Sequence, residues 1–95
     1  MGTHLMEQKP AVLIHAENIP SAAQLAHVFL EAWRYFAELK QPLPPLPDDI
    51  AKYAGCDLLI TQTETDDGMR TGKVTLTQDG VVRYDSDWVI CTARA

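Results

Sequence analysis

A run of prolines near the middle of the chain constrains its fold more than any other feature. Four of the six prolines fall within 42–47. Proline lacks an amide hydrogen and has a fixed φ, so this run cannot form the interior of a helix or a central strand. We therefore expect a stiff polyproline II connector at 41–47, with separate secondary structure before and after it.

The segment before the connector predicts one long amphipathic helix. Ser21 and Gln24 form a capping box, and no Gly or Pro follows before Pro42, so the helix should run from 21 to about 40. Apolar residues with the i, i+3, i+4, i+7 spacing of a buried stripe occur at Leu25, Val28, Phe29, Ala32, Trp33, Phe36 and Leu39.

The apolar surface of this helix is wider than a flat sheet would cover. At about 100° per residue its apolar arc spans roughly 220°. Either a strongly curved sheet wraps the helix, or one flank is left for a second copy or a partner. The residues of that flank are Ala26, Leu30, Trp33 and Ala37.

Other elements follow from turn and capping residues. The apolar run 11–16 lies between Pro10 and Pro20 and predicts a buried strand. After the connector, Asp48 is the expected N-cap of a short helix that Gly55 ends. From 57 onward, β-branched residues and Asp-Gly turns predict strands, the first of them at 58–65.

The strand register depends on the turn around Gly80. A two-residue turn would place Leu76 opposite Arg83, mixing apolar and charged side chains on one face. We therefore expect a three-residue loop with Gly80 in the left-handed region, which places Leu76 opposite Val82. The acidic segment 85–87 then predicts a further turn, so that the last strand follows it.

Together these elements predict a single two-layer α+β domain at 10–95: strand, long helix, short helix and four-stranded antiparallel meander, with the helix packed on the sheet or wrapped by it. This order resembles that of cystatin-like folds, whose sheet curls around a helix. The inhibitory turns of that family, Gln-x-Val-x-Gly and Pro-Trp, are absent, since 62–66 reads Gln-Thr-Glu-Thr-Asp and Asp87 precedes Trp88. The resemblance implies an architecture and no activity.

Composition limits the classes of partner. Apolar residues make up 46% and charged residues 22% of the 95 positions, which is typical of a folded domain. Eight basic against 13 acidic residues give a net charge of -5 and argue against nucleic acid or anionic lipid. The longest apolar run, 11–14, is far shorter than the roughly 20 residues of a membrane span. We expect a cytoplasmic protein, with 1–9 a flexible leader and Met6 its natural start.

Few residues suggest reactive chemistry. His15 and Glu17 lie between the first strand and the start of the long helix, where free amide groups attract anions. With Tyr84 and Trp88 as aromatic walls, they form a candidate ligand pocket between the helix and a curved sheet. The alternative is that His15 packs at the strand edge with one ring nitrogen bonded to a carbonyl.

Metal, cofactor and redox sites are not expected. The histidines lack metal-ligand spacing, and the acidic segments 64–68 and 85–87 fit turn chemistry better than a calcium loop. Cys56 and Cys91 lie too far apart in the sequence for a C-x-x-C pair, so both are expected as reduced thiols of the core.

The leading hypothesis is a small non-enzymatic binding protein that acts through protein–protein contacts as a homodimer. Its anchors would be Leu30 and Trp33 on the uncovered helix flank. One alternative is a small-molecule binding protein or weak enzyme with a pocket between helix and curved sheet. A further alternative is an acidic inhibitor of a basic partner.

Overall fold

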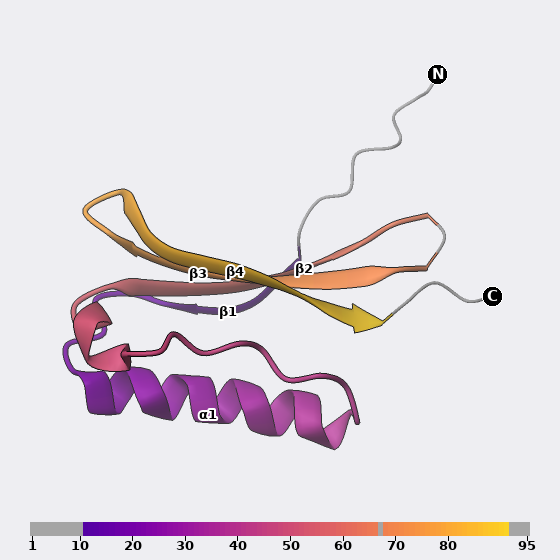
Figure 1. Cartoon of the computed structure of the whole chain (residues 1–95), viewed down its shortest axis with the longest axis horizontal. Coiled ribbons are helices and arrows are strands. Elements are labelled where there is room, and N and C mark those ends of the chain that lie inside the picture. Colours follow the sequence, from indigo (N-terminus) through magenta and orange to yellow (C-terminus); the bar gives the residue numbers. More distant parts are fainter. Residues whose placement is uncertain (1–10, 67, 92–95) are drawn as a thin grey trace.

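A computed structural model describes residues 11–66 and 68–91 of the chain. Figure 1 shows one long helix lying along one face of a twisted antiparallel sheet whose strand order is β1-β2-β3-β4. The predicted two-layer α+β class is confirmed. The elements in chain order are β1 (Ala11–Ala16), α1 (Ala22–Glu38), the 3-10 helix η1 (Ile50–Tyr53), β2 (Asp57–Glu64), β3 (Arg70–Gln78) and β4 (Val81–Cys91).

The first strand and the start of the helix form where their sequence signals place them. β1 has the predicted bounds, but it is an edge strand without a fully buried side chain and not the buried strand expected. Ser21 is the N-cap of α1, and its Oγ accepts a hydrogen bond of 3.2 Å from the amide of Gln24. The helix ends at Glu38, and Lys40 then adopts a positive φ of 57° before the prolines begin. The capping box therefore predicts the start of α1 correctly.

The β3–β4 hairpin corrects the expected register. Gln78 pairs with Val81, so the turn has only two residues, Asp79 and Gly80, with φ of 54° and 78°. These values are typical of a type I′ turn, and Gly80 is left-handed as predicted. The predicted three-residue loop is wrong because the register shifts at a bulge and not at the turn. Arg83 is an extra residue in β4, and it brings Tyr84, rather than Val82, opposite Leu76.

The expected turn at 85–87 is also wrong. β4 continues through it without interruption, so three strands follow the helices and β1 is the fourth strand of the sheet. Asp85 and Asp87 pair with Thr75 and Lys73 on the face of the sheet away from α1. Charged residues of this kind are common on an edge strand, where they oppose pairing with another chain. The sequence 85–87 therefore protects an edge instead of making a turn.

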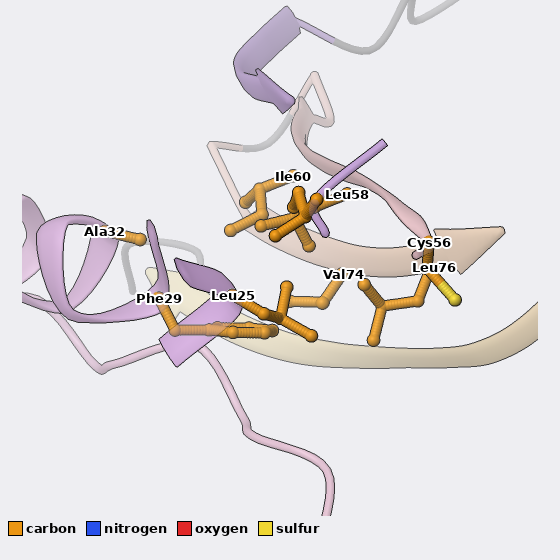
Figure 2. Close-up of a cluster of buried hydrophobic side chains, with 9 residues drawn as sticks. Leu25, Phe29, Ala32, Cys56, Leu58, Ile60, Val74 and Leu76 are labelled. Carbon is orange, nitrogen blue, oxygen red and sulfur yellow. The ribbon is translucent and has the colours of Figure 1, made fainter. Parts of the chain in front are cut away.

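The core lies between α1 and the middle of the sheet. Figure 2 shows helix side chains meeting those of β2 and β3. Leu39, expected in the buried stripe, is 50% exposed beyond the end of α1. The fully buried side chains of the interface are Leu25, Phe29, Ala32 and Phe36 of α1 and Leu58, Ile60, Val74 and Leu76 of the sheet.

The second helix is shorter than expected and starts one residue later. It is a 3-10 turn whose N-cap is Asp49, not Asp48, and the Asp49 carboxylate accepts a hydrogen bond of 3.2 Å from Ala51. Only one of two adjacent aspartates can occupy the cap, and their sequence does not distinguish them. Gly55 follows with φ 91°, in the left-handed conformation that favours glycine.

Hydrogen bonds join the loop before α1 to the segment that leads into β2. The amide of Ile19 donates to the carbonyl of Cys56 (3.1 Å), and the amide of Gly55 donates to the carbonyl of Ile19 (2.6 Å). The amide of Asn18 donates to the Asp57 carboxylate at 2.9 Å. These bonds fix the N-terminal end of α1 over the sheet.

Candidate functional site

The proline-rich connector lies against the helix and the sheet. It runs back along α1 toward η1 (Figure 1). The indole Nε1 of Trp33 on α1 donates to the carbonyl of Pro44 at 2.8 Å, and that of Trp88 on β4 donates to the carbonyl of Pro42 at 3.1 Å. Proline offers only a carbonyl for hydrogen bonding, so these indole donors match what the connector can accept.

The position of the connector accounts for the wide apolar arc of α1. Trp33 points toward the connector, and the buried Pro44 accepts its indole hydrogen. The expectation allowed either a strongly curved sheet or an open flank. In the structure a third element, the connector, covers part of that flank, because polyproline segments can pack their rings on aromatic side chains without needing amide partners.

A groove remains between α1 and the later part of the connector, and we call it the connector groove. Its volume is about 240 Å³. Three of the four predicted flank residues line it, whereas Ala37 is exposed elsewhere on α1. The groove is lined by Ala26, Phe29, Leu30 and Trp33 from α1 and by Leu46, Pro47, Asp48 and Ile50 from the other side.

The chemistry of the connector groove suits an apolar group. Asp48 is the single ionisable side chain among its described lining residues. The indole N–H of Trp33 is already bonded to Pro44. The volume lies below the roughly 300–1,000 Å³ of most small-molecule sites, yet exceeds the about 150 Å³ cavity that can hold a benzene ring. The groove therefore has room for one or two apolar side chains.

The four residues of the predicted ligand pocket are not brought together. His15 and Glu17 lie at the β1 edge, where His15 Nε2 and Glu17 Oε2 are 3.5 Å apart and both side chains are exposed. Tyr84 and Trp88 lie on β4 at the opposite edge. Three inter-strand spacings of about 4.8 Å separate the two edges by roughly 14 Å.

The space expected for that pocket is filled by side chains. Trp88 packs edge-to-face on Phe36 of α1, with ring centroids 5.5 Å apart. Tyr84 packs against Tyr53 of η1 at 5.8 Å, and Arg83 lies 5.7 Å from the Tyr53 ring centre. These aromatic residues therefore serve helix–sheet packing.

Trp88 also requires the glycine opposite it. Gly72 is the β3 partner of Trp88, and a Cβ at this position would lie closer than 3.0 Å to three carbons of the indole ring. The backbone of Gly72 does not have a positive φ, so the need for glycine is one of space. Gly72 thus allows Trp88 to lie flat on the sheet and reach the connector.

Reasoning from the sequence missed the residues that form the far wall of the connector groove. Leu46, Pro47 and Ile50 lie in or just after the proline run, which was expected to act as a spacer. One sequence feature could have indicated that the connector packs on the fold. Its prolines offer carbonyl acceptors, and the two tryptophans of the chain offer indole N–H donors.

Other candidate groups are dispersed. His27 and Glu31, four residues apart on α1, lie with Nε2 and Oε2 3.2 Å apart, whereas Arg34 and Glu38 form no ion pair among the described residues. Cys56 is buried and Cys91 is half-buried, and no disulfide joins them. Asp67 and the expected leader lie outside the described residues.

Two further kinds of feature are absent from the part of the chain that the structure describes. Within 11–66 and 68–91, no group of three or more His, Cys, Asp or Glu side chains is placed to hold a metal ion. The same residues contain no helix long and apolar enough to cross a membrane.

Comparison with known proteins finds no matching family model, no matching curated protein and no matching solved structure.

Proposed function

We propose that this protein is a non-catalytic interaction module that associates with a second copy of itself through the connector groove. The observation that carries the proposal is the position of Leu30. This side chain is 52% exposed and lies at the lip of the apolar groove that it helps to line.

A surface that carries both a projecting apolar side chain and an apolar groove is complementary to the same surface on a second copy. When two copies meet about a two-fold axis, each can place Leu30 in the groove of the other. Trp33 would then form part of the floor, and aromatic residues of this kind often contribute much of the binding energy at interfaces. Asp48 lies at the edge of the groove, where it stays hydrated.

The other functions considered have less support. A small-molecule pocket that joins His15 and Glu17 to Tyr84 and Trp88 would need the middle of the helix–sheet interface, which Phe29, Phe36 and the core leucines occupy. An acidic inhibitor would need its acids gathered on one surface. Asp79 lies in a turn at one end of the sheet, whereas Asp85 and Asp87 lie along the β4 edge.

The proposal is tested by sedimentation and light scattering over a micromolar to millimolar concentration range. We expect the wild-type chain to dimerise with increasing concentration and Leu30→Glu to remain monomeric, because a carboxylate in the groove would be buried without a partner. The matched control is Leu43→Glu, since Leu43 is 43% exposed on the connector but does not line the groove.

Leu43→Glu should dimerise as the wild type does, and far-UV circular dichroism should show that both variants are folded. A wild-type chain that stays monomeric at millimolar concentration refutes the dimer. Equal dimerisation of wild type and Leu30→Glu would refute the role of the groove.

A further inference from the structure

The two edges of the helix–sheet sandwich are closed differently. An α-helix is about 10 Å across, whereas the outer strands of a four-stranded sheet lie roughly 14 Å apart before their side chains are counted. One helix therefore cannot cover the whole sheet. At the β4 edge the connector fills the gap through its bonds to Trp33 and Trp88.

None of the described elements covers the β1 edge. A cavity of about 350 Å³ lies there between β1 and the flank of α1 that faces away from the connector groove, and we call it the edge cavity. Two hydrophobic residues of its walls are largely exposed, Val12 at 61% and Tyr35 at 51%. The cavity is lined by Val12, Leu13 and Ile14 of β1 and by Glu31, Tyr35 and Phe36 of α1.

A bulge in β1 shapes this cavity. Val12 pairs with Thr61 and Ile14 with Ile60, so Leu13 is an extra residue without a partner on β2. In a regular strand, successive side chains alternate between the two faces. The bulge lets three successive residues line one cavity, and it also interrupts the outer edge against which an added strand would pair. The edge is therefore better suited to receive side chains than a β-strand.

The exposed margin of the edge cavity is acidic. Glu31 lines the cavity with a side chain that is 62% exposed, and Glu17, 67% exposed, follows the end of β1. Glu38 is exposed further along α1, and Arg34 is the one basic residue on this stretch of the helix. Three glutamates against one arginine give this stretch an excess of acidic side chains, which favours a basic ligand.

We propose that the edge cavity docks an amphipathic helix of a protein partner, which lies beside α1 and covers β1. Such a helix would complete the helical layer over the sheet. Its apolar residues at i, i+3, i+4 and i+7 would fill the cavity against Val12, Ile14 and Tyr35, and Lys or Arg residues along its margin would face Glu17 and Glu31. The proposal does not depend on dimerisation through the connector groove.

Two synthetic helical peptides of equal length test it. Both carry Leu at the i, i+3, i+4, i+7 positions, and the remaining positions are mainly Lys in one peptide and mainly Glu in the other. Amide chemical shifts of the labelled protein, in the Leu30→Glu background, are followed during each titration. We expect the Lys peptide to shift 12–14 and 31–36, to leave 46–50 unchanged, and to bind at least about tenfold more tightly than the Glu peptide.

Matched variants locate the contact. Val12→Asn should weaken binding of the Lys peptide several-fold, whereas Val81→Asn should not, because Val81 is equally exposed (60%) but lies on β4. Glu31→Gln should reduce the preference for the Lys peptide, with Glu64→Gln at the end of β2 as its control. Far-UV circular dichroism of all four variants confirms that they are folded.

Four results would overturn the proposal. The first is no shift at 12–14 at saturating peptide, and the second is equal binding of the two peptides. The third is a concentration-dependent shift at 12–14 without peptide, which would mean that a second copy covers the edge. The fourth is a shift at 12–14 on removal of 1–8, which would mean that the chain itself occupies the cavity.

Discussion

Replacing Gly72 by alanine tests whether the contacts of Trp88 with the sheet, the helix and the connector stabilise the fold. The new methyl group would lie closer than 3.0 Å to three indole carbons. The ring cannot move away freely, because its Nε1 donates to Pro42 at 3.1 Å and it packs edge-to-face with Phe36, with ring centroids 5.5 Å apart. Relief of the clash must therefore disturb at least one of these contacts.

The size of the effect follows from these terms. Overpacking of a well-packed site costs about 1–3 kcal/mol, and loss of the indole hydrogen bond costs about 1 kcal/mol more. Alanine in place of glycine lowers the conformational entropy of the unfolded chain, and this offsets about 0.4–1 kcal/mol of the loss. We expect Gly72→Ala to lower the free energy of unfolding by about 1–3.5 kcal/mol, a large part of the stability of a small domain.

Urea unfolding followed by far-UV circular dichroism measures this change, provided that the slope m is the same in both proteins. The same substitution in a Trp88→Leu background is the control. Without the indole ring, Gly72→Ala should be neutral or stabilising by about 0.4–1 kcal/mol. A loss below about 0.5 kcal/mol in the wild type, or an equal loss in both backgrounds, would refute the steric explanation.

Two further substitutions test single hydrogen bonds. Trp33→Phe keeps an aromatic ring but removes the donor to Pro44, so we expect a loss of about 1 kcal/mol in urea unfolding. An unchanged midpoint would show that this bond does not stabilise the fold. Ser21→Ala removes the acceptor for the Gln24 amide and should cost about 1 kcal/mol, whereas Ser21→Asp should restore most of it. If Ser21→Asp is as unstable as Ser21→Ala, the loss of the N-cap does not explain the lower stability of Ser21→Ala.

The elements with local sequence signals could be predicted. β1 lies between two prolines, and α1 begins at a capping box, so their limits depend on residues a few positions apart. The β3–β4 turn shows where such reasoning fails. An Asp-Gly pair indicates a two-residue turn, but the apolar pattern argued against it unless Arg83 forms a bulge. The sequence contains no separate indication of that extra residue.

Features that depend on distant contacts could not be predicted. The helix flank containing Leu30 was identified as unusually apolar, but the coverage given by the connector depends on Trp33 and Trp88 finding carbonyls far away in the sequence. The local sequence around Asp85 and Asp87 predicts a turn. In the structure both residues lie on an edge strand, where their charges oppose pairing with another chain. Local propensity does not encode which strand is at the edge.

The two indole bonds to the connector also determine what optical measurements report. Trp33 and Trp88 are the only tryptophans of the chain, and both donate to connector carbonyls. Intrinsic fluorescence therefore reports mainly on the seating of 42–44, whereas far-UV circular dichroism reports on α1 and the sheet. A state in which the connector detaches while helix and sheet remain would change emission and leave the dichroism intact, so the two spectra separate local opening from global unfolding.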